Sequence, residues 1–221
     1  MDINQEKVFL VFLPLVSFSP GTEDIIMQSK SKNRKQIEQL ALMALLTAMV
    51  AILAYFGGFI KIGGLASISL TLIPVVLGSA LCGPLWGAWL GFVSGAVFFI
   101  TADAAFWLGL SVPGTIITVL VKGAMAGLCA GIVYKLLEKY NRYLAIIVAA
   151  VTAPVVNTGI FLIGCLLFFI DTVRAWAVAE GLSVGVYLIV FFVGLNFIFE
   201  LITNIVLSPA ILRVINIKKK S

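Results

Sequence analysis

A long apolar stretch without charge constrains the fold of this chain most strongly. It runs from residue 68 to residue 95 and reads ISLTLIPVVLGSALCGPLWGAWLGFVSG. Such a stretch is typical of helices in lipid, and the Gly83-Pro84 step in its middle breaks a helix. Gly87, Gly91 and Gly95 recur every four residues, which lets one helix face approach a neighbour closely. A second series with the same spacing, Gly123, Gly127 and Gly131, lies in the expected span 113–136. The stretch therefore predicts a tight membrane hairpin of two short spans within a helical bundle.

The composition extends this prediction to the whole chain. Of 221 residues, 62% are hydrophobic and 11% are charged, and the mean hydropathy is +1.15. Soluble domains are about 25% charged. Because a spanning helix needs about 20 residues, the length allows about six spans and leaves no room for a soluble catalytic domain. We predict an all-α integral membrane protein, a compact bundle of six transmembrane helices.

The basic residues predict the topology. One basic cluster precedes the first expected span (37–56), a second lies in a loop, and a third ends the chain. The expected spans are 37–56, the two halves of the hairpin, 113–136, 143–170 and 184–215, with outer loops at 57–69 and 101–112. The basic residues concerned are Lys30, Lys32, Arg34, Lys35, Lys135, Lys139, Arg142 and Lys218 to Lys220. Cytoplasmic loops are enriched in Lys and Arg, so both termini are expected in the cytoplasm, and nucleic acid is not an expected partner.

The N-terminal segment stands apart from the bundle. Its apolar run, 8–18, is too short to span, and it lacks the basic flank of a secretory signal. Two interpretations are open: residues 1–29 are an extension created by the choice of start site, or they lie in the membrane interface. Residues 30–221 then form the six-helix membrane domain.

The cysteines offer no metal chemistry. Cys82, Cys129 and Cys165 all fall inside expected spans, and the chain has no histidine. A disulfide framework and a Cys/His zinc site are therefore not expected, and we interpret the cysteines as small core residues. No metal and no cofactor are predicted.

Ionisable residues inside spans are the main functional candidates. Lys122 lies near mid-membrane, where insertion costs roughly 2.5 to 3.5 kcal/mol, and Glu200 lies similarly deep in the last span. Lys122 either contacts a ligand or pairs with Glu200, and both hold if the pair borders a cavity. Asn196, Glu200 and Asn204 recur every four residues and form a polar stripe; for Asn204, helix packing is the favoured role.

Further polar and aromatic residues complete the expected binding site. Asn157 and Thr158 follow Pro154, which frees a backbone carbonyl and can bend the helix, so they either contact ligand or bond a neighbouring helix. The outer loops supply candidates to cover a ligand, with the membrane-interface belt as the competing role for the aromatic ones. These are Phe59, Lys61, Phe106, Trp107 and Trp176.

The segment IPVVLGSALCGPLWGAWLGFVSG, with Ala44 and Ala48 in the first span, resembles the substrate-binding S components of energy-coupling factor (ECF) vitamin transporters. The resemblance covers about residues 37–214. It implies that the domain 30–221 binds a water-soluble vitamin near its outer face. It also implies a transmembrane coupling subunit and two cytoplasmic ATPase subunits as partners, with Ala44 and Ala48 on the docking face. The chain has no phosphate-binding loop of the GxxxxGK[ST] type, so energy has to come from those partners.

The substrate and two other functions stay open at this stage. One lysine among asparagines suits a modest anion, so pantothenate is the first candidate, with riboflavin and folate next. One alternative is a self-sufficient small secondary transporter or channel, which the lack of an inverted repeat disfavours. The other is a membrane enzyme, for which Lys122 and Glu200 are the available acid/base couple; no nucleophile or metal set supports it.

Overall fold

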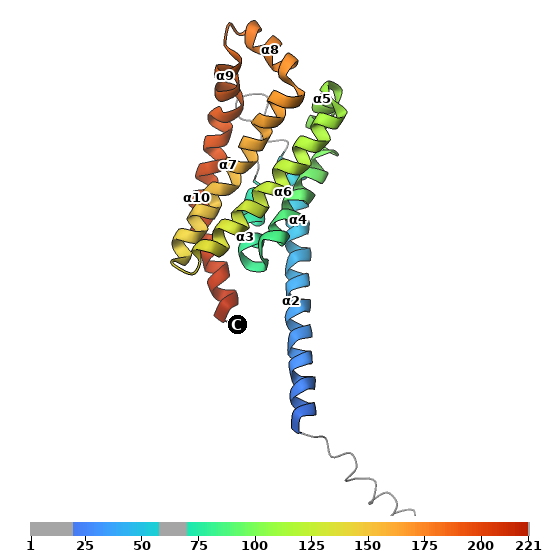
Figure 1. Cartoon of the computed structure of the whole chain (residues 1–221), viewed down its shortest axis with the longest axis vertical. Helices are drawn as coiled ribbons and strands as arrows, with labels where there is room; N and C mark the ends of the chain where they lie inside the picture. The colour runs from blue at the N-terminus through green and yellow to red at the C-terminus, as the bar shows by residue number, and fades with distance from the viewer. Residues whose placement is uncertain (1–19, 58–69, 221) are drawn as a thin grey trace, which may run out of the picture. The chain divides into compact units, whose positions relative to one another are not determined.

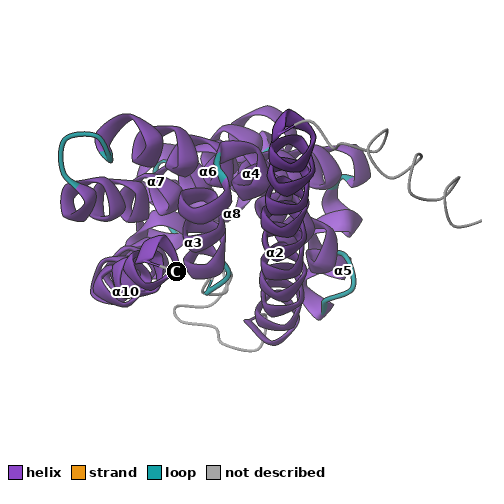
Figure 2. Ribbon diagram, turned by 90° about the horizontal axis from the view of Figure 1, so that it is seen from below, coloured by secondary structure: helices purple, strands orange, loops and turns teal. Residues whose placement is uncertain are grey.

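The computed structural model describes residues 20–57 and 70–220, and within these ranges every regular element is a helix (Figure 2). The chain divides into two units, residues 1–42 and 43–221. Helix α2 (Pro20–Gly57) crosses the boundary between them. In the first unit, Arg34 Nε donates to Glu38 Oε1 at 3.1 Å one turn along the exposed helix. An exposed pair of this spacing contributes only about 0.3–0.5 kcal/mol.

The second unit contains the remaining helices (Figure 1). In chain order they are α3 (Leu72–Cys82), α4 (Pro84–Phe98), α5 (Ala102–Leu110), α6 (Val112–Leu137), α7 (Arg142–Phe168), α8 (Ile170–Ala179), α9 (Val184–Tyr187), the π-helical turn η2 (Leu188–Val193) and α10 (Gly194–Lys220). Among the described residues, four helical segments are long and apolar enough to cross a membrane, and the number rises to six if each of two bent helix pairs forms one span. The predicted all-α membrane fold is confirmed, and the orientation of the termini stays a prediction.

The hairpin break occurs where the sequence predicts it. Gly83 separates α3 from α4 with φ 105°, a conformation that glycine adopts without strain, and Pro84 begins α4 at a position that needs no N–H donor. The first half of the hairpin, α3, is short, however. The 11 residues of α3 rise about 16 Å, roughly half of a bilayer core.

The two glycine series pack against each other. A Cβ atom on Gly87 would collide with the backbone of Gly127, and one on Gly91 would collide with the backbone of Gly123. Gly95 likewise faces the carbonyl oxygen of Val119, 2.8 Å from the place where its Cβ would be. Helices α4 and α6 therefore meet backbone to backbone along several turns. Side chains larger than hydrogen are excluded from this contact, which we call the glycine seam.

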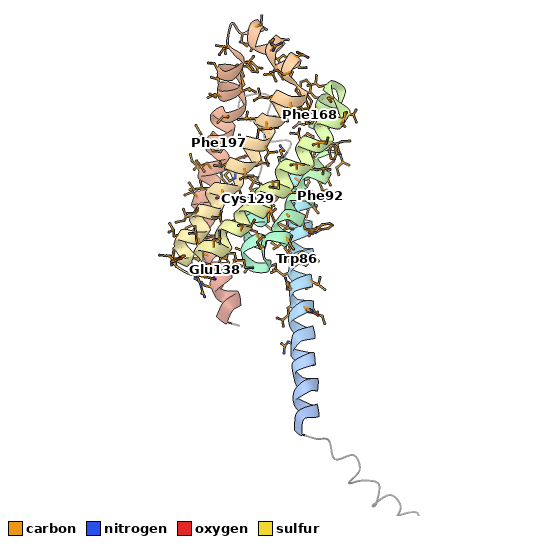
Figure 3. All side chains as sticks on the ribbon, viewed as in Figure 1. Trp86, Phe92, Cys129, Glu138, Phe168 and Phe197 are labelled. Carbon is orange, nitrogen blue, oxygen red and sulfur yellow. The ribbon has the colours of Figure 1, made fainter. Side chains whose placement is uncertain are left out.

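Helix α7 runs antiparallel to α6 and packs closely on a side of α6 that α4 does not cover. Thr118 fills the space left by Gly164, and Phe168 lies against Gly114. Figure 3 shows the two ends of this pair, with Glu138 where α6 turns into α7 and Phe168 at the far end of α7. Asn141 caps α7, since its Oδ1 accepts from the backbone N–H groups of Tyr143 and Leu144.

An aliphatic core joins α3, α6, α7 and α10 at the end of the unit where α6 turns into α7. Its fully buried members include Val76, Ala130, Ile146 and Ile215. The C-terminal end of α10 thus lies at the same end as the loop 138–141 (Figure 1). Two of the basic clusters used to predict the topology are therefore on one side, as the positive-inside pattern requires.

Three local predictions are wrong. The expected outer loop 101–112 contains the helix α5, which is bent by 85° from α4. The outer loop expected around Trp176 instead contains the helix α8, bent by 91° from the helix that follows it. The expected span 184–215 is not one helix, because α9, η2 and α10 meet at a break before Gly194. Short helices that lie across a membrane end carry few of the signals that separate spans from loops.

Candidate functional site

The site begins with a lysine held inside the helical unit. Lys122 is the eleventh residue of α6, about 15 Å along the helix axis, and its side chain is only partly exposed. Its Nζ lies over the ring of Phe161 on α7, 5.0 Å from the ring centroid. A cation over an aromatic face contributes about 2 kcal/mol when it is shielded from water. Phe161 thus partly compensates the loss of hydration at the ammonium group.

A carboxylate from the last helix accompanies this lysine. Glu200 on α10 is 6% exposed and interacts electrostatically with Lys122, as does the Cys165 side chain on α7. Two opposite charges stabilise each other more strongly in a shielded site than in water. Helices α6 and α10 therefore carry opposite charges within electrostatic reach of each other. Figure 3 shows Phe197, three residues before Glu200, on α10 beside α7.

Aromatic rings continue from Phe161 toward the bent helices. Trp107 on α5 packs edge-on against Phe161 at 5.4 Å and against Phe169 at 5.5 Å between centroids. Trp176 on α8 is stacked on Phe106 at 6.0 Å and lies 6.5 Å from Trp107. We call this set the aromatic cluster. Its members are Phe106, Trp107, Phe161, Phe169, Trp176, Tyr187 and Phe191.

The aromatic cluster is assembled by local hydrogen bonds and burial. Thr115 at the start of α6 donates its hydroxyl to the backbone oxygen of Trp107 at 2.7 Å, which ties α5 to α6. Trp107 itself is 7% exposed, and Val173 and Ala177 bury the inner face of α8 beneath it. Trp107 is therefore a buried residue and not part of an interface belt, whereas Phe106 is 46% exposed.

Asn157 is a buried amide one helical turn from Phe161. The four-residue spacing puts Asn157, Phe161 and Cys165 on one face of α7. The side chain of Asn157 is 8% exposed, and none of its hydrogen bonds is found among the described residues. An amide carries both donors and an acceptor, so this position is suited to a polar group that arrives with a ligand. Pro154 precedes it without ending α7.

The other candidates from the sequence are placed less centrally. Thr158 points from the next position of α7 and is partly buried, and Asn204 is fully buried. Asn196 belongs to α10, but its side chain lies outside the described residues, as do Phe59 and Lys61 entirely. Asp171 and Arg174 form an exposed pair on α8 at 3.6 Å. The described residues thus bring together Lys122, Glu200 and, through Phe161, Trp107.

Sequence reasoning missed Phe161, the residue that links the lysine to the aromatic cluster. A phenylalanine in an apolar span shows no contrast with its surroundings, whereas a lysine does. The available signal was the four-residue spacing of Asn157, Phe161 and Cys165, which marks one helix face. Tyr187 and Phe191 have the same spacing and stack at 4.5 Å.

Comparison with known proteins agrees with the resemblance seen in the sequence. A family model for the substrate-specific component of ECF transporters matches residues 38–212. No curated protein and no solved structure matches the chain. The family match covers both the glycine seam and the charged pair in the apolar helices. The chain therefore belongs to the family of substrate-specific components of ECF transporters, and it is a multi-pass membrane protein.

Proposed function

We propose that this chain is the membrane-embedded subunit that captures a water-soluble vitamin at the outer face for an ECF-type, ATP-driven importer. The observation that carries the proposal is the position of Lys122, half-way along an apolar helix, over the ring of Phe161 and within electrostatic reach of Glu200. Ionisable groups at such depth are costly and mark ligand pathways in membrane proteins. The buried amide of Asn157 on the same face of α7 supplies a second polar contact.

The aromatic cluster supports binding at this place. Its rings come from α7 and from the bent elements α5, α8, α9 and η2, so a ligand beside Lys122 would be covered by apolar side chains. Ligand sites combine mostly apolar walls with a few placed polar groups. Lys122, Asn157, Thr158, Asn196, Glu200, Lys61 and Trp107 remain the proposed binding residues.

Among vitamins, pantothenate is the first candidate. Its carboxylate would meet the Lys122 ammonium, and its amide and hydroxyl groups would pair with Asn157 and neighbouring polar side chains. Riboflavin and folate follow. The order rests on the types of residue present, since residue types at depth constrain the charge of a ligand more than its shape. We propose no enzyme activity.

A binding panel tests the proposal. Pantothenate, riboflavin and folate are each added to the purified protein, and the temperature of unfolding is measured. A ligand at one hundred times its Kd stabilises the folded state by about 2.7 kcal/mol, so a bound vitamin raises that temperature measurably. We expect pantothenate to give the largest rise. If no vitamin in the panel stabilises the protein, the proposal fails.

We propose that the exposed face of α2 binds the coupling subunit. Met43, Leu46 and Val50 are buried in the second unit, with Leu46 near Gly78, whereas Ala44 and Ala48 are exposed. Small residues on an exposed face let partner helices approach closely. Coupling to two cytoplasmic ATPases through this face would supply the energy that the chain cannot generate itself.

Bulky substitutions test the docking face. We expect Ala44→Trp or Ala48→Trp to stop vitamin uptake by cells while leaving binding to the purified protein unchanged, because the tryptophan holds the coupling helices away. The matched control is Ile132→Trp, which adds the same ring to an exposed position of α6. Uptake at the normal rate in both alanine variants would show that α2 docks through other residues.

A further inference from the structure

The ring of Phe161 lies under the Lys122 ammonium and bears no charge of its own. The Nζ atom is 5.0 Å from the ring centroid. An ammonium group has three N–H donors on a compact head. One side of the ammonium can therefore rest on the ring while N–H groups on the other side bind a ligand carboxylate.

Phe161 is itself held by a buried neighbour. Trp107 packs edge-on against it, with 5.4 Å between the centroids and 82° between the ring planes. Trp107 is 7% exposed, and the Thr115 hydroxyl donates to its backbone oxygen at 2.7 Å. Thr115 lies about two turns before Lys122 on the same helix, α6. The ring is thus ordered before a ligand arrives, and binding does not have to order it.

A lysine needs such support to keep its charge in one place. Its flexible stem has many rotamers, and inside a membrane it tends to carry the ammonium toward the surface. A carboxylate such as Glu200, which is within electrostatic reach, would compete with an anionic ligand for the ammonium. An aromatic face attracts the cation through its quadrupole and has no net charge. It can therefore hold the ammonium and leave the positive charge available to the ligand.

We propose that Phe161 is a positioning residue for the Lys122 ammonium, and that it makes the site select anionic over uncharged vitamins. The ring contact persists when the ligand carboxylate binds the ammonium. The apparent Kd of an anion rises as the fraction of molecules with the ammonium in place falls, and loss of the ring lowers that fraction. An uncharged ligand gains little from the ammonium. The inference rests on the proposed vitamin-binding function and assigns its selectivity to one ring.

A matched pair of ligands tests the selectivity. Pantothenol has the structure of pantothenate with a CH₂OH group in place of the carboxylate. The Kd of each ligand is measured by titration calorimetry with the wild-type protein and with Phe161→Leu, which keeps an apolar side chain but lacks the ring face. We expect pantothenate to bind about tenfold more weakly to the variant, and the Kd of pantothenol to change by about twofold or less.

Phe169→Leu is the control for packing. Phe169 lies 5.5 Å from Trp107, nearly the same distance as Phe161, and is 3% exposed. The control removes an equal ring from the same tryptophan and leaves the ring over the ammonium in place. Disturbed packing acts on both ligands alike, so the ratio of the two Kd values should stay that of the wild type.

Ring fluorination tests the electrostatic part and does not depend on the leucine variant folding. Phenylalanine with one, two or three ring fluorines is incorporated at position 161. Fluorine withdraws electrons and weakens the negative ring face, while the shape of the ring is nearly kept. Pantothenate affinity should fall stepwise with each added fluorine, and pantothenol affinity should not. A flat series for pantothenate overturns the inference.

The outcomes separate this inference from the proposed function. An unchanged Kd of pantothenate in Phe161→Leu, or equal losses for both ligands, overturns the positioning role and leaves vitamin capture standing. If folate binds in place of pantothenate, its Kd in the same variants decides the matter in the same way. Binding of riboflavin alone, which is uncharged, overturns the inference and leaves capture standing. If no vitamin of the panel binds, both proposals fall.

Discussion

Lys122→Met is expected to abolish binding of an anionic vitamin. The substitution keeps an unbranched side chain of similar length but removes the proposed countercharge inside the apolar helices, and it leaves Glu200 near the ligand as a like charge. Removing one partner of a buried charge pair between protein and ligand costs about 2–5 kcal/mol of binding free energy, which corresponds to a loss of affinity of about thirtyfold or more. The Kd of pantothenate, measured by calorimetry at constant pH, gives the result.

The matched control is Lys135→Met, which removes an exposed lysine from the last turn of the same helix. This variant should bind with unchanged affinity. Protein stability is measured in parallel, because an unpaired Glu200 also destabilises the folded state of the first variant. If Lys122→Met binds as tightly as the wild type, the lysine serves only as the structural partner of Glu200.

Gly91→Ala is expected to destabilise the folded unit by about 3 kcal/mol, at the upper end of overpacking effects. The added Cβ would collide with the carbonyl group of Gly123, which belongs to the backbone and cannot rotate away. Helices α4 and α6 would have to separate along the whole glycine seam. The temperature of unfolding in detergent, and the yield of folded protein, measure the effect.

Gly159→Ala on α7 is the control for this prediction. It adds the same methyl group inside a helix, but nothing lies within 4 Å of the new Cβ. Because alanine favours helix over glycine, the control should be neutral or slightly stabilising. Equal destabilisation by both substitutions would mean that loss of glycine as such, and not the close approach of α4 and α6, is responsible.

The sequence predicted the parts of the fold that depend on strong local signals. Gly83-Pro84 allows few conformations, so the break between α3 and α4 was readable. The glycine series at Gly87 and Gly123 each indicated a closely packed face, but only the structure shows that the two faces meet each other. Pairing of helices distant in the chain depends on long-range geometry, which spacing within one helix does not encode.

The bent ends were not predictable in the same way. Residues 101–112 contain Thr101, Asp103 and Ser111, which are as common in loops as at helix ends. In the structure, Ser111 caps α6 by accepting from the N–H of Gly114. Asp103 lies in the first turn of α5. No proline marks the break before Gly194 in the sequence. The break follows a π-helical turn whose sequence, LIVFFV, is uniformly apolar.

Candidate site residues could be predicted from the sequence where polar side chains occur within apolar spans. Lys122, Glu200 and Asn157 stand out in apolar spans, and the structure places the first two within electrostatic reach of each other. Phe161 does not stand out, and its role follows only from the distance to the Lys122 ammonium. Which vitamin fits depends on shape as well as charge, and shape is a property of several helices together.

The glycine seam also limits how this molecule can move. Two helices that touch through backbone atoms have no rotamers with which to accommodate sliding, so α4 and α6 should behave as one stiff pair through a transport cycle. Near Lys122, by contrast, the rings of Phe161, Trp107 and Trp176 pack on one another through side chains, which can tilt and repack. Any path that opens toward Lys122 therefore has its fixed wall at α4 and α6, and its adjustable wall at the helices that carry those rings.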